Sequence, residues 1–244
     1  MNRFLIKKIN PVGNEIILDD IEQVHHLKNV LRIRPGEIVG IFDGSGNEFI
    51  SSVVEVTVNE IKLAIKEKKI SPEPGIKITV ACAIPKNVKM DDIVDKLTQL
   101  GVKSIIPLET ERVIVRLDKQ KKAERKKRWE KIALSALKQS QRNEMVEIKE
   151  VSSLKEVIDW SKDFDLKLIP TLEGGRAALK KVFNSISKKI DNLIILIGPE
   201  GDFSPSEIAR AKEAGFLPVG LGSGVLRVDT AAIAVVSFIK LNEA

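Results

Sequence analysis

Two glycine-containing segments near the carboxyl end of the chain carry the residues with the most informative chemistry. The first, GPEG at residues 198–201, follows an apolar run at residues 193–197. A helix pattern comes next, in which Ser204 is a good N-cap, Pro205 suits the first helical position and Glu207 completes a capping box. Glycines at the carboxyl end of a strand let a ligand approach the backbone closely, and open α/β sheets bind ligands at that edge.

The second segment is LGSGVLR at residues 221–227, which follows the next apolar run, and Asp229 and Thr230 then begin a helix. We expect the two glycine loops to lie at adjacent strand ends and to form a pocket. Arg227 beside this pocket is a candidate for binding an anion or a base; the plainer alternatives are two tight turns and a surface arginine. The first loop has neither the GxGxxG spacing nor a Walker A pattern, so no dinucleotide or nucleoside triphosphate site is expected there.

The elements that must position these loops are predicted by periodicity. From about residue 75 onward, apolar runs and helical patterns alternate, which favours a parallel sheet covered by helices. The expected strands are residues 78–83, 104–108, 166–170, 193–197 and 216–221, and the expected helices are residues 91–100, 119–142, 176–188, 204–214 and 229–241. The last helix is apolar nearly all round, so we expect it to be buried, in the core or against another subunit.

The first 70 residues predict a small β-rich region. Residues 43–47 have the composition of a hairpin turn, alternating strands are expected at residues 53–58 and 61–65, and residues 20–31 have the pattern of a helix. Two prolines and a glycine at residues 71–75 indicate a linker. We therefore expect two domains, at residues 1–72 and 73–244.

The excess of positive charge lies in one segment. Residues 116–131 hold nine basic and three acidic residues, an excess of six that equals the net charge of +6 of the whole chain. A local basic excess suits a polyanionic partner such as nucleic acid, and Lys126 and Arg128 are candidate contacts. The alternative is a solvated basic helix face.

Composition excludes several classes of protein. Hydrophobic residues make up 43% of the chain, which argues against a disordered chain. One cysteine and two histidines exclude a disulfide scaffold and a Cys/His zinc site, so no metal is expected. There is no apolar run of about 18 residues and no signal-peptide core. These absences predict a soluble protein of a reducing compartment, the cytoplasm.

Several motifs in order along the chain resemble the RsmE family. These are SPOUT-class methyltransferases that use S-adenosylmethionine to methylate N3 of a uridine in small-subunit (16S) ribosomal RNA. The matching segments are GPEGDFSPSEI from residue 198, LGSGVLRVDTA from residue 221, KLTQLGV at residues 96–102, Glu111-Arg112, QSQR at residues 139–142, Arg3-Phe4, HLKNVLR at residues 26–32, Gly36 and FDGSG at residues 42–46.

The chain also departs from the family pattern at several positions. Asp202 stands where a second glycine is usual, and Gly224 stands where an arginine is usual. Asp229 replaces a glutamate and keeps its charge, Lys138 replaces an acidic residue, and Gln99 stands where glutamate is common. These differences affect the expected geometry of the site and leave the class unchanged.

The resemblance implies a parallel α/β domain with a carboxy-terminal trefoil knot, preceded by a PUA-like RNA-binding domain, and it implies a homodimer. It also implies that S-adenosylmethionine lies bent among three loops. The corresponding residues here are Thr171, Leu172, Gly198, Pro199, Glu200, Gly201, Leu221, Gly222, Val225, Leu226, Arg227 and Thr230.

Methylation of a uracil nitrogen requires placement of the methyl group in line with that nitrogen and removal of the imide proton. We hypothesise that Arg227 or Arg142 stabilises the uracil anion and that Glu200 or Asp229 accepts the proton. Glu200 could instead hold loop amides.

For RNA contact the candidates are Arg3, His26 and Arg32 in the amino-terminal domain. The alternative for His26 is an ordinary half-buried helix residue. Arg112 could meet phosphate, or pair with Glu109 or Glu111.

Two rival functions stay open at this point. One is a SPOUT methyltransferase that acts on a ribose 2′-oxygen or on another base. The other is a ribosome-assembly or RNA-binding protein that has lost its cofactor pocket, for which Asp202 and Gly224 are the supporting features.

Overall fold

The computed structural model describes residues 2–6, 9, 11–70, 75–85, 89–112 and 118–243, in two compact units. The first unit contains the described residues up to 70 together with residues 138–145, and the second contains residues 75–137 and 146–243. The expected boundary after residue 72 lies outside the described residues and stays a prediction. Inclusion of residues 138–145 in the first unit was not predicted.

The first unit is built on a five-stranded sheet. Its strands, in spatial order, are β1 (Asn2–Leu5), β3 (Ile38–Phe42), β4 (Asn47–Val56), β5 (Ile61–Ile70) and β2 (Glu15–Leu18), and the pairs are antiparallel except for the parallel pair β1–β3. Helix α1 (Ile21–His25) begins at the N-cap Asp20 and continues as one π-helical turn, His26–Val30. Val24 and Leu27 of this helix are buried with the apolar face of the sheet. The predicted helix and hairpin are both present.

The second unit is built on a parallel sheet. Its main path is β11 (Ala177–Ala178), β13 (Leu217–Gly220), β10 (Leu166–Pro170), β12 (Asn192–Ile197), β6 (Lys77–Ala83), β7 (Ser104–Glu109) and β8 (Glu147–Ile148), and β9 (Ser152–Ser153) also pairs with β7. Every described pair in this sheet is parallel. β10 lies between β12 and β13, so the prediction that the two glycine loops follow adjacent strands is wrong.

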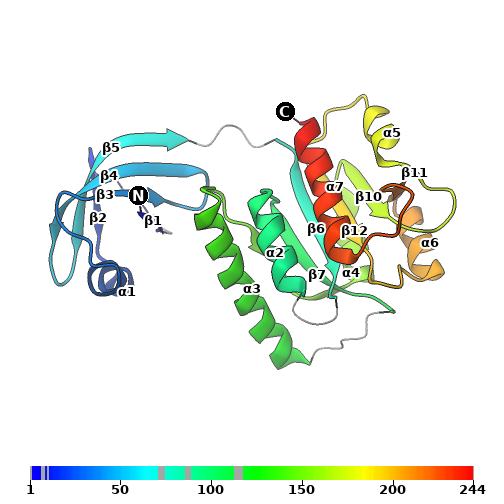
Figure 1. Ribbon diagram of the computed structural model, residues 1–244, viewed down its shortest axis with the longest axis horizontal. Coiled ribbons are helices and arrows are strands. Elements are labelled where there is room, and N and C mark those ends of the chain that lie inside the picture. The colour runs from blue at the N-terminus through cyan, green and yellow to red at the C-terminus, as the bar shows by residue number, and fades with distance from the viewer. Residues whose placement is uncertain are drawn as a thin grey trace. The chain divides into compact units, whose positions relative to one another are not determined.

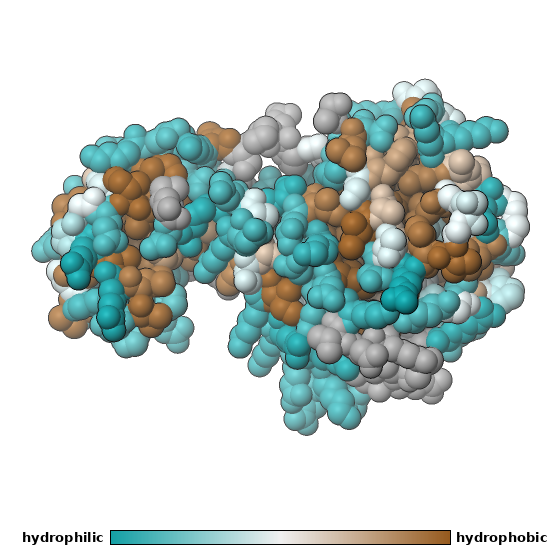
Figure 2. Space-filling model, in the orientation of Figure 1, coloured by the Kyte–Doolittle hydropathy of each residue, from teal (hydrophilic) through white to brown (hydrophobic). Residues whose placement is uncertain are grey.

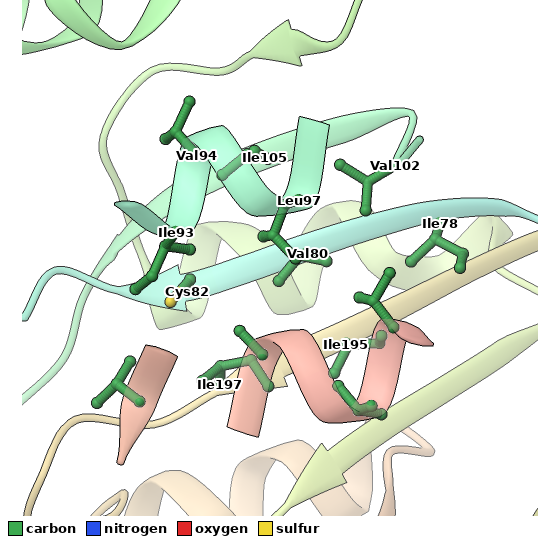
Figure 3. Packing of buried hydrophobic residues seen from close by; sticks show 14 of the residues in the cluster. Ile78, Val80, Cys82, Ile93, Val94, Leu97, Val102, Ile105, Ile195 and Ile197 are labelled. Atoms are coloured by element: carbon green, nitrogen blue, oxygen red, sulfur yellow. The ribbon is translucent and has the colours of Figure 1, made fainter. Parts of the chain in front are cut away.

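Alternate residues of the central strands are buried on opposite faces of the sheet, as the period of a β-strand requires. On one face, side chains such as Val80 and Ile195 pack against α2 (Lys89–Gln99), α3 (Lys119–Gln139) and α7 (Val228–Asn242). On the other face, Ala81 and Ile194 pack against α4 (Leu154–Trp160) and α6 (Pro205–Glu213). Figure 1 shows α2 and α7 side by side over β6, and Figure 3 shows the interdigitated side chains of this layer.

Several element boundaries differ from the predictions. The helix expected at residues 119–142 ends at Gln139, because Gln141 adopts a left-handed φ of 57°. The helix expected at residues 176–188 is reduced to α5 (Leu179–Asn184), preceded by β11. Strands β1, β2, β8 and β9 were not predicted, since each has only two to four residues. Helix α4 was not predicted either, although Ser153 and Glu156 form a capping box at its start.

The structure confirms a parallel α/β domain and a small β-rich amino-terminal domain. The carboxy-terminal trefoil knot stays a prediction. Within the described residues, no helix is long and apolar enough to cross a membrane. The same residues contain no group of three or more His, Cys, Asp or Glu side chains able to hold a metal ion.

Candidate functional site

A pocket lies where the neighbouring parallel strands β13, β10 and β12 end. About 600 Å³ of space lies within it, open solvent included. Three segments supply most of its wall, and we call residues 171–176, 198–203 and 221–227 the first, second and third pocket loops. The lining is Pro170, Thr171, Leu172, Arg176, Ile197, Gly198, Pro199, Glu200, Asp202, Val219, Leu221, Gly222, Gly224, Val225, Leu226, Val228 and Ala231.

The first pocket loop follows β10, and one acidic and one basic side chain, Asp202 and Arg176, bind its backbone. The Thr171 hydroxyl and the Leu172 backbone N–H donate to Oδ2 of Asp202, at 2.8 and 2.7 Å. Arg176 Nη1 donates to the Leu172 carbonyl oxygen. The side chain of Arg176 also passes close to Gly220, where an added Cβ would lie 3.2 Å from its Nε atom. Both polar backbone groups of Leu172 are therefore bonded within the protein.

The second pocket loop is shaped by a close contact and a left-handed residue. A Cβ at position 198 would lie 3.0 Å from the ring of Phe203, which is buried, so only glycine fits there without displacement. Asp202 adopts a φ of 60°, and its Oδ1 accepts from the Phe203 N–H at 2.8 Å. Asp and Asn adopt this conformation more readily than other non-glycine residues.

Arg112 and Glu207 support the second pocket loop from outside. Arg112 donates from Nη1 to the carbonyl oxygens of Gly201 and Phe203, at 2.7 and 3.3 Å. Glu207 is buried and forms the predicted capping box with Ser204, and its other oxygen accepts from the Glu111 N–H at 2.8 Å. Sequence reasoning missed the bonds of Arg112 and the bond between Glu111 and Glu207, because each joins residues about 90 positions apart.

The third pocket loop is the most exposed part of the wall. Gly222 has a φ of 128°, a conformation that favours glycine, whereas a Cβ at Gly224 would meet no atom within 4 Å. Val225 is 72% exposed and Leu226 37%. The absence of the arginine usual at position 224 leaves open space.

The pocket carries both signs of charge. Arg176 is its one cationic lining residue among those described, and Glu200 and Asp202 are its acidic ones. Asp229 is not a lining residue but follows the lining residue Val228, and its buried Oδ1 has no hydrogen-bond partner in the described structure. Burial, reinforced by the carboxylates of Asp229 and Glu200, raises the pKa of the Cys82 thiol at the end of β6. Both carboxylates therefore lie within electrostatic reach of this strand end.

Most of the predicted cofactor-binding residues lie together on the lining. They are Thr171, Leu172, Gly198, Pro199, Glu200, Leu221, Gly222, Val225 and Leu226. The lining does not include Gly201, Arg227 or Thr230, which are exposed and next to lining residues in the sequence. Arg176 and Asp202 line the pocket and were not among the predicted site residues. Asp202 had been noted only as a departure from the family pattern, and nothing in the sequence indicated Arg176.

The predicted catalytic residues are divided between the two units. Glu200, Asp229 and Arg227 belong to the second unit, and Arg142 belongs to the first. Arg227 is the exposed N-cap residue of α7, and its side chain has no partner among the described residues. Glu200 is also exposed and has no hydrogen bond within the described structure, so it does not hold loop amides; Asp202 does.

Arg3, a predicted RNA contact, is engaged inside the first unit. Its Nε donates to Glu48 Oε1 at 2.8 Å, and both side chains are about one-tenth exposed. The guanidinium also donates to the Asn143 side chain and to the carbonyl oxygens of Lys138 and Arg142, and it lies over the ring of Phe42. These bonds explain why residues 138–145 join this unit. RNA contact by Arg3 stays a prediction that requires some of these bonds to open.

The other two predicted RNA contacts of the first unit are exposed. His26 begins the π-helical turn and lines a shallow hollow with Phe4, Gln23 and Lys138 among others. Arg32 adopts a left-handed φ of 52° directly after that turn. A π-helical turn is often found at functional sites. The positions of His26 and Arg32 are therefore compatible with contact to a ligand.

The basic segment lies mainly on α3, and its charges are partly paired. Of the predicted contacts, Lys126 pairs with Glu150 at 2.5 Å and Arg128 pairs with Asp91 at 2.5 Å. Lys127 and Lys131 are exposed without an ion pair among the described residues. Figure 2 shows hydrophilic side chains over the part of the surface that α3 occupies in Figure 1. Residues 116 and 117 of the segment lie outside the described residues.

Comparison with known proteins gives consistent results. Residues 71–240 match the family described as RNA methyltransferase domain, and residues 18–66 match the RNA methyltransferase PUA domain. The chain is 31% identical to ribosomal RNA small subunit methyltransferase E of Bacillus subtilis (strain 168), over 90% of this chain and 87% of the relative. It is 33% identical to the protein of that name from Mesomycoplasma hyopneumoniae (strain 232), over 96% of each.

A solved structure agrees with these relatives in fold. The crystal structure of a ribosomal RNA small subunit methyltransferase E from Neisseria gonorrhoeae, bound to S-adenosyl methionine, superposes with a TM-score of 0.83 at 30% identity. The match covers 99% of this chain and 98% of that one. The likeness therefore extends over both units.

Proposed function

The chain belongs to the ribosomal RNA small subunit methyltransferase E family, and from this premise we propose that it transfers a methyl group from S-adenosylmethionine to N3 of a uridine in 16S ribosomal RNA. The observation that carries this proposal is the pocket made by three loops at the ends of neighbouring parallel strands. A pocket at this edge is where an open α/β sheet binds its ligand.

The residues of the pocket fit S-adenosylmethionine. When bound, this donor supplies a methyl group activated by a positively charged sulfonium. Glu200, which lines the pocket and accepts no hydrogen bond within the described structure, is an acidic group that suits a cation. Apolar walls from Leu172, Val225 and Leu226 and the backbone of the glycine positions suit an adenine ring and a ribose.

The chain's own residues would then act on the uracil. For stabilisation of the uracil anion we propose Arg227; this role is supported by its guanidinium, which is exposed at the start of α7 and has no partner among the described residues. Arg142 is the alternative for this role. Glu200 is a proton acceptor that can pass the proton to solvent, since it lines the pocket and is exposed. Asp229 is the alternative acceptor.

The RNA would be bound by the amino-terminal PUA domain and by the basic segment. His26 and Arg32 are exposed on the first unit, and Lys127 and Lys131 are exposed on α3. Such contacts neutralise phosphates and position the substrate without reading its sequence. The proposed partner is 16S ribosomal RNA or the small ribosomal subunit, and we place the reaction in the cytoplasm.

We also propose that the protein acts as a homodimer. One face of α7 is buried inside the second unit, against α2, β6 and β12, so the apolar character of this helix is partly accounted for by the core. Leu241 near its end is 77% exposed. Light scattering of the purified protein should give twice the mass of the 27.0 kDa chain; the mass of one chain would reject the dimer.

The direct test of the function is nucleoside analysis. Small subunits from cells that lack this enzyme are incubated with the purified protein and labelled S-adenosylmethionine, and the ribosomal RNA is digested and analysed by mass spectrometry. We expect one new 3-methyluridine per subunit. A 2′-O-methylated nucleoside or a different methylated base would contradict the proposed chemistry, and no transfer would favour a non-catalytic RNA-binding protein.

A further inference from the structure

Asp202 joins the first and second pocket loops. Its Oδ2 accepts hydrogen bonds from the Thr171 hydroxyl and the Leu172 N–H, and its Oδ1 accepts from the Phe203 N–H, with all three distances between 2.7 and 2.8 Å. Leu172 lies 30 positions from Asp202 in the sequence, so this carboxylate ties together loops that follow different strands. We call these three hydrogen bonds the Asp202 bridge.

The Asp202 bridge is bonded to the first pocket loop at Thr171 and Leu172. Leu172 is 46% exposed, so packing alone does not fix its position. Its N–H is bound by Asp202 and its carbonyl oxygen by Arg176. A loop held by these bonds would not have to be ordered by the ligand, so the entropic cost of binding would be lower.

The carboxylate of Asp202 is already occupied by protein donors. Both of its oxygens accept hydrogen bonds from backbone or hydroxyl groups, whereas Glu200 on the same wall accepts none in the described structure. A carboxylate that serves three internal donors is suited to holding loops. A carboxylate without a hydrogen-bond donor inside the protein, such as that of Glu200, is suited to contacting a ligand directly.

We propose that Asp202 is a positioning residue, which sets the affinity for S-adenosylmethionine by holding the first pocket loop against the second. This inference rests on the proposed function. Because the bridge orders the loop equally for substrate and transition state, its loss should raise KM more than it lowers kcat.

The main variant is Asp202→Gly. Glycine adopts a φ of 60° without strain, so this substitution removes the bridge and leaves the backbone conformation accessible. Asp202→Asn serves as a partial rescue, since its amide oxygen still accepts on one side while its NH₂ group opposes a donor on the other. Glu173→Gln is the matched control: Glu173 follows Leu172 but does not line the pocket, and its carboxylate makes only an exposed ion pair with Lys212 at 3.5 Å.

Calorimetry with two ligands separates positioning from direct contact. S-adenosylmethionine carries the sulfonium charge, and S-adenosylhomocysteine lacks it. For Asp202→Gly we expect the Kd of both ligands to rise about tenfold, equivalent to about 1.4 kcal/mol, with kcat within about threefold of wild type. We expect a smaller rise for Asp202→Asn and none for Glu173→Gln. A Kd within twofold of wild type for Asp202→Gly would overturn the proposal, and so would a loss confined to S-adenosylmethionine, which would indicate direct contact with the sulfonium.

Two further measurements test the bridge itself. Thr171→Val removes one hydrogen-bond donor of the bridge and also the hydroxyl that accepts from the Glu173 N–H at 3.1 Å. Combined with Asp202→Gly it should therefore cost less binding free energy than the sum of the two single variants; fully additive losses would contradict the bridge. Hydrogen exchange of the ligand-free protein should show faster exchange at Leu172 in Asp202→Gly, and unchanged exchange would reject the bridge. If the wild type did not bind S-adenosylmethionine, the proposed function would fail. The hydrogen-exchange result would still decide whether the bridge exists.

Discussion

The first two pocket loops differ from the third in how they are held. Asp202 and Arg176 bind the backbone of the first loop, and Arg112 binds carbonyl oxygens of the second. In the described structure, residues 222–226 of the third loop make no hydrogen bond. The pocket therefore has an ordered wall and an open wall. An ordered wall lowers the entropic cost of ligand binding, and an open wall gives substrates access to the reacting atoms.

The largest effect should come from the end of the open wall. Arg227→Ala removes the guanidinium proposed to stabilise the uracil anion, so we expect kcat to fall about 100-fold or more. The Kd for S-adenosylmethionine should stay within about twofold of wild type. Steady-state methylation assays and calorimetry measure the two quantities; a near-normal kcat would remove Arg227 from the mechanism and leave Arg142 as the candidate.

Adding a methyl group to the ordered wall should destabilise the protein, whereas adding one to the open wall should not. Gly198→Ala places a Cβ about 3.0 Å from the buried ring of Phe203, so we expect a loss of about 1–3 kcal/mol in the free energy of unfolding. Gly224→Ala, in the open wall, meets no atom within 4 Å and should change stability little. Urea denaturation of both variants measures this difference. Equal stability of the two variants would contradict the close packing of the second loop.

Arg112→Ala tests whether this arginine holds the ordered wall or meets RNA. The loss of its bonds to Gly201 and Phe203 should raise the KM for S-adenosylmethionine about threefold to tenfold. The salt dependence of RNA binding should not change. If the KM for S-adenosylmethionine is unaffected and the salt dependence of RNA binding becomes weaker, Arg112 contacts phosphate. Phosphate contact is the role that the sequence analysis considers first for Arg112.

The smallest effects are expected far from either wall, on α3. Lys127→Ala and Lys131→Ala should each lower the slope of log K against log salt concentration by about one if these lysines contact phosphates. Lys126→Ala, whose charge is paired with Glu150, should change the slope less. Filter binding to ribosomal RNA at several salt concentrations provides the slopes. No change in the three variants would make this segment a solvated helix face.

The sequence allowed prediction of those parts of the site that depend on local signals. The helix after the second loop was predicted from Ser204, Pro205 and Glu207, which act within one turn, and β10 was predicted from its apolar run. The order of the strands could not be predicted, because β10 separates β12 from β13 through crossovers that no local pattern records. The Asp202 bridge and the burial of Arg3 depend on residues 30 or more positions apart, so sequence reasoning could identify Asp202 as unusual without explaining it.

The three pocket loops are the proposed binding site for S-adenosylmethionine. A crystal structure of the protein grown with this molecule tests the claim most directly. We expect electron density for the donor between Leu172, Gly198 and Leu226, with the Asp202 bridge intact. Density at a different place, or an empty pocket closed by the protein's own side chains at saturating donor, would contradict the account.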